Sequence, residues 1–236
     1  MTFTWATGSH RGRIRENNED SVYPPTGGRT EGGLLVAVAD GMGGHVGGEI
    51  ASRFAIDTVA ADPDLPLADR VSAANDVILA KADATPDLRG MGTTLTAAQF
   101  LPDGSLSVAH VGDSRAYLMR VGILEQLTND HSVVAEYLRA GSIRPEDVAT
   151  HPQRSMLTRA LGLYPNVEVD MLEVKTRSGD RLLVCSDGLT SMVDEQRIAA
   201  TLGLGTPEET VWTLIEVANQ MGGHDNISLV VVDVGP

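Results

Sequence analysis

Four aspartates lie next to the ends of predicted strands, and their side chains are the ones in this sequence best suited to chemistry. They are Asp40, Asp113, Asp187 and Asp225. Asp40 follows the unbroken apolar run 34–39, a pattern typical of a fully buried strand. If the last predicted strand, 227–234, runs antiparallel beside strand 181–185, its start and its neighbour's end lie at one edge of the sheet. We therefore expect these carboxylates to converge there, joined by Glu19 and Asp20.

Carboxylates this close together cannot all stay ionised without a counter-charge, because repulsion and desolvation raise their pKa values. Divalent cations supply that charge, and a site of carboxylates, backbone carbonyls and water suits Mg²⁺ or Mn²⁺. Histidine and cysteine ligands are not evident, which argues against zinc. Taken singly, an aspartate beside a glycine is more often a turn residue than a ligand. The joint pattern of four aspartates is what predicts a metal site.

A glycine-rich turn with the sequence GMGGH, residues 41–45, follows Asp40, and a helix is predicted after Gly48. A strand, a glycine-rich turn and a helix in this order also begin dinucleotide-binding sites. Here Val46 stands where the third glycine of that motif should be, and Asp40 would repel a pyrophosphate. No Lys-Ser/Thr pair follows, so a Walker-type phosphate loop is not predicted either. The turn is better explained as the support of a fixed carboxylate ligand.

The bulk composition is that of an acidic globular protein, with 236 residues, 42% of them hydrophobic, and a net charge of −14. The length allows one sizeable core and no boundary is evident, so we expect a single domain over residues 1–236. The charge argues against nucleic acid or an anionic membrane as the main partner. The one cysteine, Cys185, indicates a reducing, cytoplasmic compartment. We expect no signal peptide, no membrane span and a monomer.

Short predicted strands alternate with helices along the chain. Strands are expected at 3–7 (an edge strand), 21–23, 34–39, 93–100, 106–111, 116–120, 124–128, 167–175, 181–185 and 227–234. Helices are expected at 48–57 and 68–84, with two more after residue 185; residues 8–12 should form a turn and 24–33 a loop. The polar stretch 130–160, with one short helix, is expected to be a mobile flap. This order predicts a layered α/β domain with largely antiparallel sheets.

Six motifs occur in an order that resembles the metal-dependent protein phosphatases (the PPM or type 2C serine/threonine phosphatases) in their bacterial form. The motifs are Arg15-x-x-Asn18-Glu19-Asp20, Ala39-Asp40-Gly41-Met42-Gly43-Gly44-His45, Gly92-Thr93-Thr94, Val111-Gly112-Asp113-Ser114-Arg115, Cys185-Ser186-Asp187-Gly188-Leu189 and Asp225-Asn226. Each motif alone is weak, but the ordered set is highly specific and spans residues 15–234. The resemblance implies a β-sandwich of two mostly antiparallel sheets flanked by helix pairs, with a dinuclear metal site at one end.

The resemblance also implies which residues hold two core ions, Mg²⁺ or Mn²⁺. Asp40 would bridge the two ions, and Gly41 would offer its backbone carbonyl. Asp187 and Asp225 would complete the shell of the first ion.

Further residues would hold water or a third, weaker ion, again as the resemblance implies. Glu19 and Asp20 would act mainly through bound waters. Asp113, together with Asp187, would hold the third ion, sometimes with Ser155. The insertion 130–160 would be the flap of the family.

The implied activity is hydrolysis of phosphoserine and phosphothreonine in proteins, a serine/threonine kinase among them. Two cations lower the pKa of a shared water and place the resulting hydroxide in line with the ester, without a covalent intermediate. Arg15 is the candidate phosphate clamp, since a guanidinium binds phosphate oxygens in pairs. His45 is a candidate proton donor to the leaving oxygen. A histidine that is merely exposed on a turn explains His45 nearly as well.

Two other functions remain open: a catalytically idle relative that serves as a regulatory binding module, and a phosphatase dedicated to one partner, such as an anti-sigma-factor antagonist. Intact metal residues and Arg15 count against the first, and no sensor or linker segment supports the second. Cys185 ends a buried strand and lacks an arginine at phosphate-loop spacing, so we expect a core residue rather than a nucleophile. Asp62-Pro-Asp64 follows no buried strand and is expected to be a turn.

Overall fold

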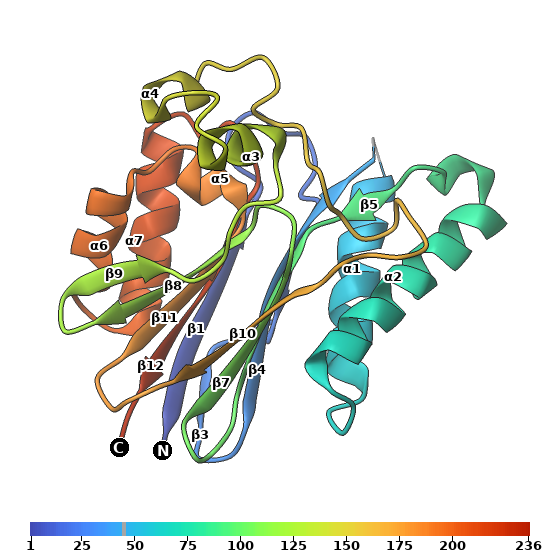
Figure 1. Ribbon diagram of the computed structural model, residues 1–236. Helices are drawn as coiled ribbons and strands as arrows, with labels where there is room; N and C mark the ends of the chain where they lie inside the picture. Colours follow the sequence, from blue (N-terminus) through green and yellow to red (C-terminus); the bar gives the residue numbers. More distant parts are fainter. Residues whose placement is uncertain (44–45) are drawn as a thin grey trace.

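Two antiparallel β-sheets face one another at the centre of the molecule (Figure 1). The computed structural model describes residues 1–43 and 46–236. The first sheet has the strand order β3-β1-β12-β11-β8-β9. The second has the order β10-β7-β6-β4-β2, and β5 pairs with the end of β4. The strands are β1 (Phe3–His10), β2 (Asp20–Tyr23), β3 (Gly28–Thr30), β4 (Leu34–Met42), β5 (Gly92–Thr93), β6 (Leu95–Phe100), β7 (Ser105–Val111), β8 (Arg115–Arg120), β9 (Ile123–Gln126), β10 (Asp170–Lys175), β11 (Arg181–Cys185) and β12 (Ile227–Val234).

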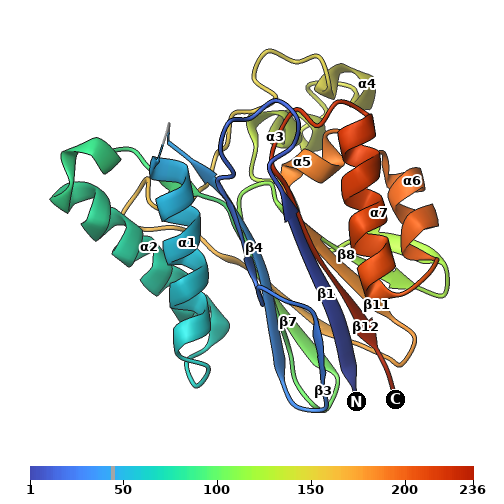
Figure 2. The ribbon, with the colours of Figure 1, turned by 180° about the vertical axis from the view of Figure 1, so that it is seen from behind.

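Helices cover the outer faces of both sheets, with α1 and α2 on one side and α6 and α7 on the other (Figures 1 and 2). The helices are α1 (Gly47–Ala61), α2 (Leu67–Ala84), α3 (Val133–Arg139), α4 (Pro145–Val148), α5 (Asp187–Thr190), α6 (Glu195–Leu202) and α7 (Pro207–Gln220), with a short 3-10 turn at Pro86–Leu88. The predicted β-sandwich of antiparallel sheets flanked by helix pairs is confirmed. Among the described residues, no helix combines the length and the apolar character needed to cross a membrane.

Strand β4 shows why the apolar run 34–39 is unbroken. Val36 and Val38 pack between the two sheets, whereas Ala37 and Ala39 pack with the residues of α1 and α2. Successive side chains of a strand point to opposite faces, so a strand covered on both sides needs an apolar residue at every position. Small alanines on the helix side let α1 lie close to the sheet, which suits a chain with few aromatic residues.

The strand ends bring the acidic segments to one end of the sandwich. β11 pairs antiparallel with β12, with Cys185 opposite Leu229, as expected. Asp187 therefore follows the end of one strand close to where Asp225 precedes its neighbour. In the second sheet β2 pairs antiparallel with β4, and Asp20 lies opposite Asp40.

Residues 3–7 lie in a strand, as predicted, but the expected place of that strand at a sheet edge and the expected turn at 8–12 are wrong. β1 runs to His10 and lies inside its sheet, between β12 and β3. β3 itself falls in the stretch 24–33 that was expected to be loop, and a three-residue strand carries too little pattern to be recognised. Gly8 lies within the strand and does not mark a turn. A glycine is needed there because α7 packs against β1 at this point, and a Cβ would overlap the side chain of Val211.

Other boundaries also differ from the prediction. β4 continues through Asp40 to Met42, because β5 pairs with its last residues, Gly41 opposite Thr93. The predicted strand 93–100 is consequently divided into β5 and β6. Within 130–160, α3 is the one short helix that was expected, but a second short helix, α4, was not predicted.

Candidate metal centre

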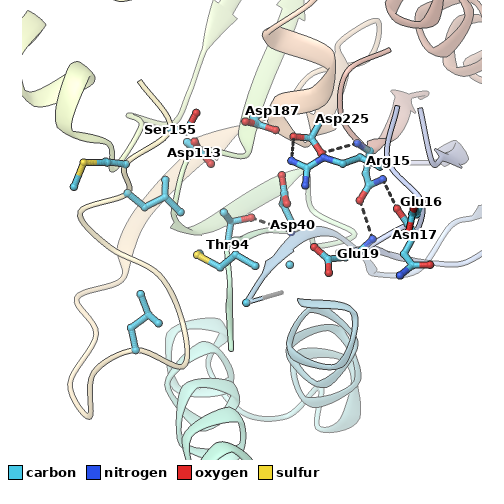
Figure 3. A pocket seen from close by; sticks show the side chains of 17 residues that line it. Arg15, Glu16, Asn17, Glu19, Asp40, Thr94, Asp113, Ser155, Asp187 and Asp225 are labelled. Carbon is cyan, nitrogen blue, oxygen red and sulfur yellow. Dashed lines mark hydrogen bonds and ion pairs between the residues drawn. The ribbon is translucent and has the colours of Figure 1, made fainter. Parts of the chain in front are cut away.

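A cavity of about 740 Å³ opens at the end of the sandwich where β4 and β11 end and β12 begins (Figure 3). Eight of the predicted site residues line it: Arg15, Glu19, Asp40, Gly41, Asp113, Ser155, Asp187 and Asp225. Asp20 is buried and lies opposite Asp40 in the β2–β4 pair, without lining the cavity. His45 lies outside the described residues.

The backbone of Asp40 is held on both sides, which leaves its carboxyl group directed into the cavity (Figure 3). Its amide donates to Thr94 Oγ1 at 3.0 Å, and its carbonyl accepts from the Thr94 amide at 2.9 Å and from Thr93 Oγ1 at 2.8 Å. Burial raises the pKa of Asp40 well above its usual range, and repulsion by Asp20 and Asp187 adds to the rise. Protonation or a bound cation would relieve this repulsion.

Gly41, the next residue, fits its place because it has no side chain. A Cβ at this position would overlap the Gly48 carbonyl oxygen, at the start of α1. The Gly41 amide donates to the Glu19 carbonyl at 3.2 Å, which ties β4 to the segment that carries Glu19. The close approach of α1 to β4 at this point therefore excludes every other residue type.

Asp187 and Asp225 lie side by side because β11 and β12 are neighbours. Gly188 allows the close approach, since a Cβ there would overlap the Asn226 carbonyl oxygen. Burial raises the pKa of Asp187, as does repulsion by Asp225. Interaction with the neighbouring Asp40 carboxyl acts in the opposite direction and lowers the pKa of Asp187. Neighbouring carboxyl groups whose pKa values are raised by desolvation and repulsion are natural ligands for a divalent ion.

The pKa values of Asp113 and Asp20 are raised for the same reasons. Burial raises the pKa of Asp113 to about 8, with repulsion by Asp187 contributing. Burial likewise raises the pKa of Asp20 to about 7. Ser186 Oγ donates to Asp20 Oδ2 at 2.8 Å, whereas Oδ1 has no hydrogen-bond partner within residues 1–43 and 46–236. A buried carboxyl oxygen without a partner is costly, and a bound water of a metal ion would satisfy it.

Arg15 contributes a positive charge to the wall of the cavity. Its Nη2 donates to Asp225 Oδ2 at 2.7 Å, and the arginine side chain is 51% exposed. This hydrogen bond is also the main cause that raises the arginine pKa. The guanidinium is therefore present in the cavity, although the residue it contacts is one of the predicted metal ligands.

These donors fit a hard divalent cation. The cavity is lined by carboxylates and by no histidine or cysteine of the described chain. No three His, Cys, Asp or Glu side chains in that part of the chain are arranged to hold one ion by themselves. Backbone carbonyl oxygens and water would have to complete each shell, which is the ligand set typical of Mg²⁺ and Mn²⁺.

Asn226 organises the site and was not recognised as doing so, although it belongs to the Asp225-Asn226 motif. It is buried, and its Oδ1 accepts from the Glu19 amide at 2.8 Å. Its Nδ2 donates to the carbonyls of Arg11 and Asn17, both at 2.9 Å. The segment that carries Arg15 and Glu19 is thus fixed to the turn that carries Asp225. Contacts over more than 200 residues leave no local pattern in the sequence.

Replacing Asn226 by alanine is expected to destabilise the protein by about 2–4 kcal/mol, since three hydrogen bonds of about 1 kcal/mol each are lost and buried groups are left unpaired. Urea unfolding of both proteins measures the difference. Asn166→Ala is the control, because Asn166 is exposed and should change the stability by less than about 0.5 kcal/mol. Equal stability of Asn226→Ala and the unchanged protein would show that these bonds do not fix the segment.

Comparison with known proteins identifies the family. Residues 7–208 match the family described as Protein phosphatase 2C. The chain belongs to the protein phosphatase 2C family. The resemblance inferred from the six motifs is confirmed.

Relatives in the protein phosphatase 2C family include serine/threonine protein phosphatase PstP of Mycobacterium tuberculosis, 43% identical over 99% of this chain but only 45% of its own length. The chain thus spans less than half of that relative. Serine/threonine phosphatase stp of Listeria monocytogenes is 41% identical, over 94% of this chain and 92% of its own.

Solved structures of the family have the same fold. The M. tuberculosis phosphatase PstP/Ppp superposes with a TM-score of 0.91 at 40% identity, covering both chains completely. The catalytic domain of PstP in complex with two manganese ions superposes with a TM-score of 0.89 at 40% identity, over 100% of this chain and 99% of that one.

Proposed function

We propose that this chain hydrolyses phosphoserine and phosphothreonine in proteins, using water activated by two divalent cations, Mg²⁺ or Mn²⁺. The observation that carries the proposal is the set of half-buried carboxyl groups with raised pKa values around an open cavity that also holds one guanidinium. Membership of the protein phosphatase 2C family and the two manganese ions bound by the PstP catalytic domain support it.

The residues on the cavity wall divide into cation ligands and a phosphate clamp. Asp40 and the Gly41 carbonyl would hold the two core ions, with Asp187 and Asp225. When bound, the ions would neutralise these carboxylates, lower the pKa of a water between them and polarise the phosphate oxygens. Glu19 and Asp20 would orient bound waters.

Two more residues would serve a third, weaker ion. Asp113 lines the cavity with a raised pKa and would hold that ion with Asp187. Ser155 lines the same cavity from the stretch 130–160, which we propose is a flap on a single catalytic domain, residues 1–236.

Arg15 would bind the phosphate oxygens of the substrate. To do so its guanidinium must turn from Asp225, and its half-exposed position leaves room for that movement. Two parallel N–H groups then face the phosphate and neutralise charge as the ester bond breaks. Donation of a proton by His45 to the leaving oxygen remains a proposal about a residue outside the described part of the chain.

Further proposals concern partners and setting. We propose that the substrates include a serine/threonine kinase, and that the protein acts as a monomer in the cytoplasm. The single, fully buried cysteine, Cys185, supports a reducing compartment. Light scattering on the purified protein tests the monomer, and a mass near twice that of one chain would contradict it.

Hydrolysis of a phosphothreonine peptide, measured with Mn²⁺ and with a chelator, tests the proposed function. We expect release of phosphate with Mn²⁺ and none with the chelator. Binding of the peptide without any release of phosphate would instead indicate a regulatory binding module. Equal rates with and without metal would contradict the mechanism.

Stabilisation by Mn²⁺ is expected to increase as the pH rises from 6 to 8.5. The raised pKa values of Asp20 (about 7) and Asp113 (about 8) mean that the metal-free folded protein holds protons that the unfolded chain releases. Its stability therefore falls as the pH rises through this range. Bound cations replace those protons, so the difference in melting temperature between Mn²⁺ and chelator should grow.

Groups that titrate outside the site cancel in this difference. One is His110, whose pKa is lowered by burial to about 4 and whose effect on stability has the opposite sign. A difference in melting temperature that is constant or shrinks with rising pH would show that the carboxyl groups do not exchange protons for metal.

A further inference from the structure

The side of the cavity that contains Ser155 continues into an apolar wall. Met42, Met156, Leu157 and Leu163 form this wall. Met156 is 52% exposed and Leu163 is 39% exposed, so both are available to a ligand. In Figure 3, Ser155 and Asp113 lie on one side of Asp40 and Arg15 on the other. Because Met156 and Leu157 directly follow Ser155, their part of the wall lies across the metal-ligand carboxylates from the phosphate clamp.

The cavity is larger than phosphate binding requires. Its volume of about 740 Å³ lies within the range of pockets that enclose drug-sized ligands, roughly 300–1,000 Å³. A phosphoryl group between Arg15 and Asp40 would leave the apolar wall free. Some other part of the same substrate molecule is therefore the natural occupant of that wall.

The segment that carries Leu163 is rigidly fixed by α2. Asn75, which is 1% exposed, accepts from the Gly162 amide at 2.8 Å and donates to the Tyr164 carbonyl at 2.9 Å. Gly162 has a φ of +86°, and a Cβ there would overlap the side chain of Ile78. Few other residues would allow the segment to lie this close to the helix, so Leu163 has a defined place.

The same segment is joined to the candidate metal centre. Thr93 donates its amide to the Leu161 carbonyl at 3.1 Å and accepts from the Leu161 amide at 2.9 Å. The Thr93 hydroxyl also donates to the Asp40 carbonyl. Asp40 and Leu163 are thus linked through one short strand, β5, which fixes the distance between the carboxylates and the apolar wall.

The charges that line the cavity also restrict which side chains of a substrate can bind beside the phosphorylated residue. Among the cavity-lining residues that the structure describes, Arg15 is the one positively charged side chain, and the acidic ones are Glu16, Glu19, Asp40, Asp113, Asp187 and Asp225. Bound cations would neutralise the carboxylates that hold them, but Glu16 would still repel acidic residues next to the phosphorylated residue of a substrate. An apolar side chain would instead bury its own surface and the apolar surface of the wall away from water, which is favourable.

We propose that the wall of Met42, Met156, Leu157 and Leu163 is a specificity subsite that receives an apolar side chain close in sequence to the phosphorylated residue of the substrate. The inference rests on the proposed function, because it takes phosphoproteins as the substrates. It adds a substrate class: phosphorylated segments with a neighbouring aliphatic residue, in preference to acidic or small polar ones.

Binding of non-hydrolysable peptides to the Mn²⁺-loaded protein tests the subsite. Each peptide consists of serine and glycine residues around a central phosphonate analogue of phosphoserine. In a series of such peptides, a single leucine replaces the residue at each of the three positions before and after the analogue in turn. Fluorescence polarisation measures each Kd. At one position or more, we expect leucine to bind about tenfold more tightly than serine, the gain typical of burying one such side chain.

Variants assign the preference to the wall. Leu163→Ala should reduce the tenfold preference to about twofold, and Leu163→Met should retain most of it, because methionine preserves volume and apolar surface. Leu101→Ala is the matched control: Leu101 is 42% exposed and lies in the β6–β7 turn, after Phe100, which pairs with the first residue of β4. That turn is at the far end of the sheet, so the preference should not change. The absence of any leucine preference, or its persistence in Leu163→Ala, would overturn the proposal.

The corresponding phosphoserine peptides separate this inference from the proposed function. If leucine improves binding of the phosphonates while none of the phosphoserine peptides is hydrolysed, the subsite stands and the proposed function fails. If all the peptides are hydrolysed and all the phosphonates bind equally well, the proposed function stands and the subsite is overturned.

Discussion

Replacing Asp40 by asparagine is expected to lower phosphothreonine-peptide hydrolysis at least about a hundredfold, since even residues outside the direct metal shell cost tenfold to a hundredfold when removed. The same change should raise the melting temperature of the metal-free protein. Asp40 is half-buried and repelled by four other aspartates, Asp20, Asp187, Asp113 and Asp225, so a neutral side chain of the same shape relieves repulsion. Loss of activity with a gain of stability is the signature of a metal ligand.

The control is Asp64→Asn, an exposed position in the connection between α1 and α2. This variant should keep both the rate and the melting temperature. If Asp40→Asn lost activity together with stability, the loss would reflect a damaged fold, and the assignment of Asp40 as a metal ligand would not stand.

Replacing Arg15 by alanine is expected to reduce kcat/KM for phosphopeptides by about a hundredfold, the usual cost of losing a donor that faces developing charge. Because Arg15 also pairs with Asp225 at 2.7 Å, its removal should free that carboxylate and tighten Mn²⁺ binding. Steady-state kinetics and calorimetric titration with Mn²⁺ measure the two effects. Arg15→Lys should recover part of the rate, since an ammonium keeps the charge but not the paired donors.

Arg13→Ala provides the comparison, because Arg13 is exposed and does not line the cavity. Rate and affinity should stay as they are in the unchanged protein. A rate for Arg15→Ala equal to that of Arg13→Ala would contradict the clamp. Weaker rather than tighter Mn²⁺ binding would show that the pair with Asp225 does not compete with the ion.

The sequence predicted those parts of the fold whose signals are local. The unbroken run 34–39 indicated a strand buried on both faces, and Val36 and Ala37 do pack on opposite sides of β4. The capping box of α7 is a signal of the same local kind, formed by Thr206 and Glu209, three residues apart. Patterns of this kind can be read because the interacting groups are close together in the chain.

The parts that were missed depend on distant contacts. The interior place of β1 follows from its pairing with β12, more than 200 residues away, and from the three-residue strand β3. The role of Asn226 and the contact between Arg15 and Asp225 likewise join the two ends of the chain. No local pattern reports such partners, although the motifs did name every aspartate that the cavity now brings together.

Anomalous diffraction from crystals soaked in Mn²⁺ tests the central claim most directly. We predict two adjacent manganese peaks beside Asp40 and the Gly41 carbonyl, one of them also contacting Asp187 and Asp225. Manganese bound elsewhere, or no ordered ion among these carboxylates at a concentration that supports hydrolysis, would contradict the claim.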